Sequence, residues 1–223
     1  MESSFARASA RDNQASVELL LVRHALPVRR ELEIGAADPP LSENGHAQAR
    51  HLAEYLAAEA PLDALYASPL NRARQTAAPI AARFGLDIVL EDAVAEWDRH
   101  SNEYVPIEEL KAADDPRWQA LLRGEWTSHD ESPEQFVERV VGAIEAMVAR
   151  HRGERIAVVC HGGVINTYLA HVLGLDGQHS FFYPNYTSIH RVAAAATGER
   201  SIVTINETAH LRGTGLPIGL FQR

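Results

Sequence analysis

The sequence predicts an α/β fold, a three-layer α/β/α sandwich with a mostly parallel central sheet and an insertion over one edge. Two observations carry this prediction. First, apolar runs alternate with stretches of helical periodicity along most of the 223 residues. Second, residues 17–22 and 155–160 are almost entirely apolar, as expected for central strands covered by helices on both faces. Such alternation is typical of a parallel sheet lying between two helix layers.

Capping and turn residues mark the ends of the expected elements. Ser42 is a good N-cap, and Ser68-Pro69 predicts the N-cap and first residue of the next helix. Gly85 ends that helix, and Pro79 predicts a kink or restart within it. Helices are therefore expected at residues 43–60, 69–84, 133–151 and 163–173. Strands are expected at residues 17–22, 62–67, 86–90, 155–160, 188–195 and 201–206, the last two being edge-type strands.

These elements predict one domain over residues 17–207. The stretch of about 95–132 interrupts the alternation, contains all three tryptophans and has one amphipathic piece, residues 107–122. We interpret it as an insertion over the edge of the sheet. Residues 1–16 are expected to form a flexible N-terminal tail, and residues 208–223 an irregular C-terminal tail.

Composition argues against several classes of function. The formal net charge of −9 disfavours a general nucleic-acid binder, and no apolar run approaches the roughly 20 residues that a membrane helix needs. The single cysteine, Cys160, rules out an intramolecular disulfide framework and suits a reducing compartment. We therefore expect a cytoplasmic protein, monomeric or homodimeric, whose partners include neither nucleic acid nor membrane.

Polar residues follow three of the expected strands. Arg23 and His24 follow the first, Arg72 lies one turn into the helix after the second, and His161-Gly162 follows the strand at 155–160. Ligands of open α/β sheets bind at the carboxyl ends of the strands, so these side chains are expected to converge there. Two arginines, two histidines and helix N-termini form a site suited to a tetrahedral dianion such as phosphate.

Four segments of the sequence together resemble the histidine phosphatase superfamily, also called the phosphoglycerate mutase-like family, in its phosphatase branch. They are LVRHA (21–25), DPPLSENGHAQA (38–49), SPLNRARQTA (68–77) and VVCHGG (158–163). They occur in the family's order, and the likeness spans roughly residues 17–170. The resemblance places the insertion over the active-site edge of the fold.

The resemblance also implies roles for individual residues. His24 is the expected nucleophile, and Glu96 stands where the family keeps its proton donor, with Asp98 and Glu103 as rival carboxylates. The residues expected to bind the phosphoryl group are Arg23, Arg72, His161 and Gly162. Arg30, in the loop after the nucleophile, is a further candidate for substrate binding.

The chemistry of these residue types agrees with those roles. A neutral imidazole can attack phosphorus and form a phosphohistidine, and the neighbouring Arg23 and Arg72 disfavour the imidazolium form of His24. Fixed cations stabilise the charge of the phosphoryl transition state, and a carboxylic acid with a raised pKa can protonate the leaving alkoxide. We therefore expect a phosphomonoester hydrolase that needs no metal and no cofactor and acts on a small phosphorylated metabolite.

Two alternatives remain at this stage. A mutase would return the phosphoryl group to a second hydroxyl, although the segment LPVRRELEIGAADPP after the nucleophile departs from the mutase pattern. A binding module would recognise phosphate without turnover. The sequence does not identify the substrate. The insertion does supply candidates for the wall of a pocket that binds the leaving group, namely Trp97, His100, Tyr104, Trp126 and His129.

Overall fold

The fold is built around a six-stranded sheet. The computed structural model describes residues 16–123, 125, 131–175 and 180–220. Along the sheet the strands are β4 (Ile88–Leu90), β3 (Ala64–Ala67), β6 (Arg155–Cys160), β1 (Val17–Arg23), β7 (Ile189–Ala194) and β8 (Arg200–Glu207). The first four are parallel to one another, while β7 is antiparallel to β1 and β8 antiparallel to β7. The mostly parallel sheet confirms the predicted fold class. Of the two strands predicted to be edge-type, β8 lies at an edge, whereas β7 lies inside the sheet.

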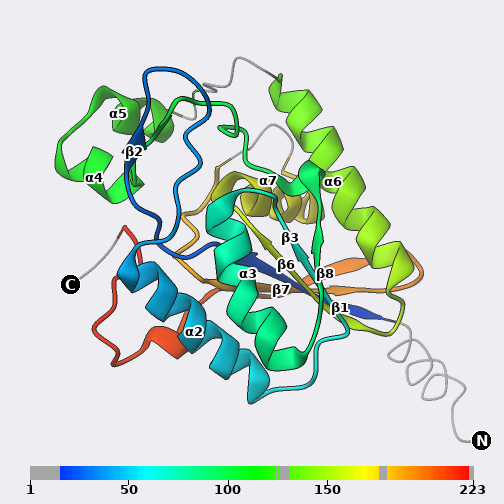
Figure 1. The fold of residues 1–223 in the computed structure, drawn as a ribbon. Coiled ribbons are helices and arrows are strands. Elements are labelled where there is room, and N and C mark those ends of the chain that lie inside the picture. The colour runs from blue at the N-terminus through cyan, green and yellow to red at the C-terminus, as the bar shows by residue number, and fades with distance from the viewer. Residues whose placement is uncertain (1–15, 124, 126–130, 176–179, 221–223) are drawn as a thin grey trace, which may run out of the picture.

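Helices cover both faces of the sheet (Figure 1). One face carries α2 (Glu43–Ala57) and α3 (Asn71–Phe84), and the other carries α6 (Pro133–Arg150) and α7 (Gly162–Leu173). Leu20 and Val22 of β1 belong to the core under α2 and α3, whereas Leu19 and Leu21 belong to the core under α6 and α7. Because successive strand residues point to opposite faces, the continuous aliphatic run of β1 supplies both cores.

The start of α3 differs from the prediction. We expected Ser68 to cap the helix and Pro69 to begin it, but α3 begins at Asn71 without a side-chain bond from its own N-cap residue. The carboxylate of Asp38 instead accepts hydrogen bonds from the Asn71 backbone N–H at 2.8 and 3.0 Å. A residue from a distant loop thus acts as the cap, which local sequence patterns do not reveal. The helix also continues through Pro79 without interruption.

Part of the insertion folds into a small cap, formed by β2, β5, α4 and α5. β5 (Glu103–Tyr104) pairs antiparallel with β2 (Arg30–Glu31), from the loop after β1. The predicted amphipathic piece forms two short helices, α4 (Ile107–Ala112) and α5 (Pro116–Leu122), with Asp114 in a left-handed conformation between them (φ 48°). The cap lies beyond one end of the central sheet (Figure 1).

The terminal segments are described in part. Residues 1–15 of the expected N-terminal tail lie outside the described residues, as do residues 221–223. In the expected C-terminal tail, His210 and Leu211 are buried in a short 3-10 helix, and the Pro217 carbonyl accepts a hydrogen bond from Gln48 of α2. Its described part therefore packs against the domain. In the described part of the chain, no helix has the length and apolar character that crossing a membrane requires.

Candidate active site

The loop that carries His24 is held by side chains of two helices. The backbone N–H of Ala25 donates to Oγ1 of Thr76 in α3 at 2.9 Å, and that of Leu26 donates to Oε1 of Gln48 in α2 at 2.8 Å. Gly45 of α2 permits this approach, since a Cβ at that position would overlap with the Leu26 carbonyl oxygen. The loop therefore places its histidine from a rigid support, as precise catalytic geometry requires.

His24 is a neutral imidazole, and one of its ring nitrogens has no hydrogen-bond partner among the described residues. It is buried, and its Nδ1 lies 2.8 Å from the carbonyl oxygen of Ala25. Because a carbonyl only accepts, Nδ1 carries the proton and Nε2 keeps its lone pair. Burial lowers the pKa of His24 well below its usual value, and the charges of Arg72 and Arg23 lower it further. The nitrogen that is free is thus in its nucleophilic form at neutral pH.

Arg23 supplies a buried cation beside His24. Its guanidinium donates to the carbonyl oxygen of Pro184 at 2.5 Å and lies over the ring of Tyr186, with 4.3 Å from Cζ to the centroid. Among the described residues no atom accepts a hydrogen bond from its Nε. A Cβ added at Gly162 would lie 3.9 Å from that Nε. A buried donor left unpaired costs free energy, so this N–H is available to an oxygen of a bound anion.

Arg72 and His161 form the opposite side of the site. Nε of Arg72 donates to Nδ1 of His161 at 3.3 Å, so His161 carries its proton on Nε2 and donates it to Oγ of Ser68 at 2.7 Å. Both residues are fully buried, and the ring centroids of His24 and His161 are 5.1 Å apart. Ser68, which we expected to cap a helix, instead fixes the tautomer and orientation of His161.

Glu96 is a buried carboxyl beside the N-terminus of α7. Its Oε2 accepts a hydrogen bond from the Gly163 N–H at 2.8 Å, and its Oε1 accepts one from the Trp97 N–H at 3.2 Å. Burial, followed by the negative charge of Asp98, raises its pKa to about 7, against the opposing effect of these N–H groups and of Arg72. A Cβ on Gly163 would overlap with Oε1 of Glu96, so glycine is required there for the carboxyl to keep its place.

Two carboxylates that we considered as rivals of Glu96 have other partners. Asp98 accepts a hydrogen bond from Arg72 at 2.9 Å, and Glu103 forms an ion pair with Arg117 of α5 at 2.7 Å. The surroundings of Glu96 raise its pKa towards neutrality. Its position favours Glu96 as the group that exchanges a proton.

Sequence reasoning missed the contribution of Arg139. This residue of α6 donates from Nη1 to the carbonyl oxygens of Ala93 and Ala95, at 2.8 and 2.9 Å. Its other nitrogens bind the carboxylate of Glu131 at 2.8 and 2.5 Å. Arg139 therefore holds two of the three backbone carbonyls that directly precede Glu96. The sequence shows that Glu131 and Arg139 lie close together along the chain, at the start of a predicted helix. No local pattern connects either residue with Glu96.

Tyr104, predicted as pocket wall, also takes part in the site. Cζ of Arg72 lies 4.7 Å from the centroid of its ring, and the His24 ring centroid lies 6.4 Å from it. Arg30 is the residue opposite Tyr104 in the β2–β5 pair, and residues directly opposite share a face of a sheet. Arg30 is thus exposed on the side of the cap that faces the site, and its role in substrate binding stays a prediction.

The comparison with protein families shows the family of this chain. The model of the Histidine phosphatase superfamily (branch 1) matches residues 19–208. The chain belongs to this superfamily. The matched region begins in β1 and ends just after β8, so it includes His24, Arg72, Glu96 and His161, the predicted residues that the fold brings together.

Named relatives support a phosphatase of the superfamily. Phosphoserine phosphatase 1 of Hydrogenobacter thermophilus is 32% identical over 202 residues, which are 87% of this chain and 94% of the relative. Phosphoglycerate mutase-like protein 4 of Arabidopsis thaliana is 32% identical over 163 residues, covering 67% and 68% of the two chains. The chain is accordingly a histidine phosphatase, an enzyme that acts on phosphate esters.

Solved structures confirm the fold. A phosphoserine phosphatase mutant from Entamoeba histolytica, crystallised with phosphoserine, has a TM-score of 0.68 at 23% identity, covering 87% of this chain and 99% of the other. A phosphoglycerate mutase from Bacillus anthracis has a TM-score of 0.69 at 18% identity, covering 90% and 97%. Both share the α/β architecture in which the cationic site of this chain lies.

Proposed function

We propose that this histidine phosphatase is a metal-independent phosphomonoesterase that acts through a phosphohistidine on His24, with Glu96 as the proton donor. The observation that carries the proposal is that the protonation states of His24 and Glu96 suit a nucleophile and a proton donor. His24 keeps Nε2 free because Nδ1 donates to the Ala25 carbonyl, while Glu96 has a pKa of about 7. One group is ready to attack, and the other holds a proton near neutral pH.

In the first step, the lone pair of His24 Nε2 attacks phosphorus and the bond from phosphorus to the ester oxygen breaks. The electron pair of that bond goes to the ester oxygen, which takes the proton of Glu96 and leaves as the alcohol. Arg23 and Arg72 balance the charge on the equatorial oxygens. The Ala25 carbonyl, which accepts from Nδ1, stabilises the positive charge that develops on the ring.

In the second step, a water molecule attacks the phosphohistidine. Glu96, now a carboxylate, takes a proton from the water as its oxygen binds phosphorus, and the bond from phosphorus to Nε2 breaks. Inorganic phosphate is released, and His24 returns to its neutral form. A carboxyl with a pKa of about 7 serves both steps, since acid and base are both populated near that pH.

The mutase and binding-module alternatives make different predictions. A mutase converts 3-phosphoglycerate to 2-phosphoglycerate, so the absence of that conversion removes it. A binding module holds phosphate but turns over no ester. The buried acid Glu96, placed at the α7 N-terminus beside the cations, favours turnover over binding alone.

The test is hydrolysis of p-nitrophenyl phosphate by chelator-treated protein. We expect full activity of the wild type after chelation and, for His24→Ala, a loss on the order of a thousandfold or more. His46→Ala, an exposed histidine of α2, is the matched control and should retain activity. Mass spectrometry after an alkaline quench should find the phosphoryl group on the peptide that contains His24. Loss of activity on chelation, or an active His24→Ala variant, would contradict the proposal.

A further inference from the structure

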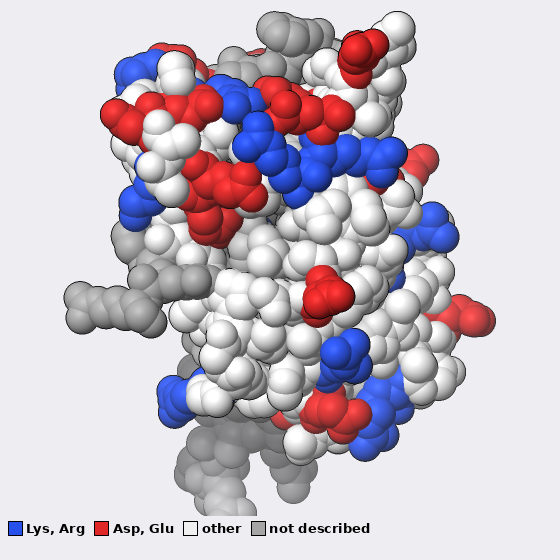
Figure 2. All heavy atoms as spheres, turned by 60° about the vertical axis from the view of Figure 1, so that its left-hand side comes forward, with Lys and Arg blue, Asp and Glu red and all other residues white. Residues whose placement is uncertain are grey.

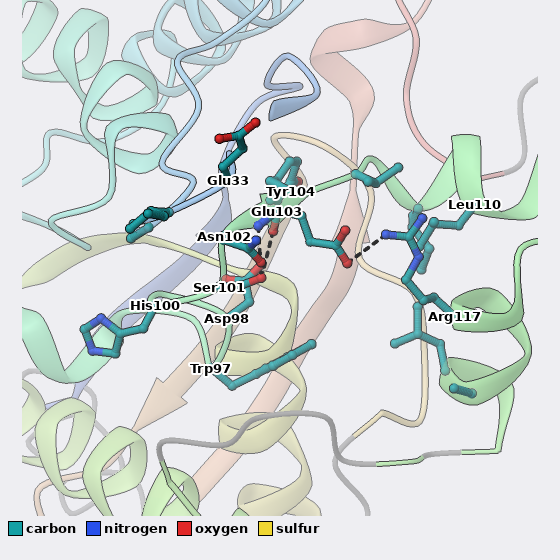
Figure 3. Close-up of a pocket in the computed structure, with 17 residues that line it drawn as sticks. Glu33, Trp97, Asp98, His100, Ser101, Asn102, Glu103, Tyr104, Leu110 and Arg117 are labelled. Atoms are coloured by element: carbon teal, nitrogen blue, oxygen red, sulfur yellow. Dashed lines mark hydrogen bonds and ion pairs between the residues drawn. The ribbon is translucent and has the colours of Figure 1, made fainter. Parts of the chain in front are cut away.

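A large cavity opens beside the active site, between the cap and the loop of residues 33–36. Its volume is about 870 Å³, within the range of about 300–1,000 Å³ that holds drug-sized ligands. Figure 3 shows Trp97 on one side of this cavity, with Leu110 and Arg117 of the cap helices on another. The expected pocket residues Trp97, His100 and Tyr104 do line it, whereas Trp126 and His129 lie outside the described residues.

The cavity begins where a leaving group would depart. Asp98 and Tyr104 line it, and both contact Arg72, at 2.9 Å from Oδ1 and 4.7 Å from the ring centroid. Trp97 follows the proposed proton donor Glu96 directly in the chain. An ester whose phosphoryl group lies between Arg23 and Arg72 therefore has its alcohol part directed towards the cavity.

Three charged side chains of the cavity wall are already paired within the protein, whereas Glu33 has no partner among the described residues. Arg117, the one arginine or lysine among its described lining residues, binds Glu103 at 2.7 Å and Asp115 at 2.8 Å (Figure 3). Asp98 is paired with Arg72. On the surface over the cap, acidic and basic side chains likewise lie next to one another (Figure 2). Among the described lining residues, the wall therefore offers no free cation to a second phosphate or a carboxylate, and Arg30 is not part of this lining.

Two hydrogen-bonding side chains of the wall are engaged in the same way. The Ser101 hydroxyl donates to the Glu103 carbonyl at 3.0 Å, and the Asn102 amide donates to the Leu32 carbonyl at 2.9 Å. The surface that remains is largely aromatic and aliphatic. It is formed by Ile34, Trp97, Tyr104, Ile107, Leu110 and Leu121. Binding of an apolar group against such a wall is favourable, because it removes apolar surface from water.

We propose that this cavity binds the alcohol part of the substrate, and that this alcohol is uncharged and carries an apolar group of at least the size of an aromatic ring. The inference rests on the proposed function, because it assumes that an ester is cleaved at His24. A three-carbon acid would leave most of the volume empty and would place its carboxylate against a wall without a free cation. The preferred substrate is thus larger and less charged than phosphoserine or 3-phosphoglycerate.

The first test is a series of alkyl phosphates of similar leaving-group acidity: ethyl, hexyl and 4-phenylbutyl phosphate, with 3-phosphoglycerate and phosphoserine for comparison. We expect kcat/KM to rise by about tenfold or more from ethyl to 4-phenylbutyl phosphate, because the ring is buried. We expect 3-phosphoglycerate and phosphoserine, which carry a carboxylate, to have lower kcat/KM values than 4-phenylbutyl phosphate. Equal values along the alkyl series, or a preference for phosphoserine, would overturn the inference.

The second test fills the cavity. Ala120 of α5 lines the cavity, whereas the adjacent Gln119 is exposed and is not part of its lining. Ala120→Trp should lower the ratio of kcat/KM for 4-phenylbutyl over ethyl phosphate by about tenfold, and the matched control Gln119→Trp should leave that ratio at the wild-type value. An unchanged ratio in Ala120→Trp, with circular dichroism showing a folded protein, would contradict the inference.

These outcomes are separable from failure of the proposed function. If His24→Ala hydrolyses ethyl phosphate as well as the wild type does, the nucleophile assignment is wrong. If hydrolysis of ethyl phosphate depends on His24 but chain length has no effect, the mechanism stands and the assignment of the cavity is wrong.

Discussion

At the scale of single residues, the environment of Glu96 opposes its ionisation. The side chain is buried next to Asp98, and its pKa is raised to about 7, while the N–H groups of Gly163 and Trp97 limit the rise. A carboxyl with an ordinary pKa would be almost entirely ionised at neutral pH and could not donate a proton. The burial of Glu96 is thus the physical basis of its proposed role.

The first residue-scale prediction concerns the pH dependence of Glu96. Phosphoryl transfer to His24 needs Glu96 protonated, so kcat/KM for ethyl phosphate should fall as the pH rises through about 7. Glu96→Gln should lower kcat/KM for ethyl phosphate by about 10²–10⁴-fold. The loss for p-nitrophenyl phosphate should be smaller, because p-nitrophenolate leaves without a proton. Steady-state kinetics from pH 5 to pH 9 with both esters measure this, and an equal loss for both would contradict the role of Glu96.

The main residues of the candidate site were predictable because each ends a strand, directly follows one, or lies in the first turn of the next helix. His24, Arg23, Arg72 and His161 occupy such positions, and parallel strands bring their carboxyl ends to one edge. The hydrogen bond from His161 to Ser68 was not predictable, since the serine appeared to be a helix cap. The Ser68 hydroxyl accepts this bond and one from the Leu70 N–H at 3.3 Å, while Asp38, a residue distant in sequence, caps α3.

At the scale of secondary-structure elements, α6 supports the backbone before Glu96, the proposed proton donor. Arg139 binds the carbonyl oxygens of Ala93 and Ala95 and is itself oriented by the carboxylate of Glu131. The planar guanidinium reaches all three partners at once, which a lysine ammonium on a flexible stem does not. The helix therefore acts on Glu96 through the backbone that precedes it.

The element-scale prediction is that Arg139 is a positioning residue for Glu96. Arg139→Lys should lower kcat for ethyl phosphate by about tenfold and leave KM near the wild-type value, because displacement of a catalytic group affects the transition state most. Activity towards p-nitrophenyl phosphate should fall less. Arg150→Lys, at the exposed end of the same helix, is the control. A uniform loss with both esters would indicate a merely structural role.

Elements of the sheet were more predictable than those of the cap. Strands β1 and β6 are recognisable in the sequence as aliphatic runs, because both of their faces are buried. The stretch of residues 107–122 has a helical pattern, yet Asp114 and Pro116 divide it into two helices. The pairing of β2 with β5 joins two-residue strands from distant loops, and segments so short leave no periodic signal.

At the scale of the whole molecule, the fold buries four of the described histidines in neutral form. His24 and His161 lie in the candidate active site. His190 belongs to β7 and bonds to Ser188, and His210 belongs to the 3-10 helix after β8 and bonds to Thr187. Burial is the largest cause of the lowered pKa of each, which reaches about 3 for His190 and about 4 for His210. The stability of the protein is therefore linked to pH through these groups.

The whole-molecule prediction is that the free energy of unfolding falls on acidification below about pH 6.5. Each folded pKa lies below the unfolded value of about 6.5, so the unfolded chain binds more protons between the two values. The stabilisation is therefore present above pH 6.5 and is lost as the pH falls towards the folded pKa. For His190 alone, the free energy of unfolding falls by about 1.4 kcal/mol per pH unit once the pH is well below 6.5.

Urea unfolding at pH 7.5, 6.0, 5.5 and 5.0 measures this linkage. His190 lies away from the attacking atoms and bonds through both ring nitrogens, to Ser188 and to the Asn206 N–H, so His190→Asn retains one donor and one acceptor. The variant should be less stable at pH 7.5, because a smaller side chain leaves a cavity. Its stability should nevertheless decrease less between pH 6.0 and 5.0 than that of the wild type, by about 1.4 kcal/mol. Equal slopes for the two proteins would show that His190 is not buried in its neutral form, and a steeper slope for the variant would reverse the sign of the linkage.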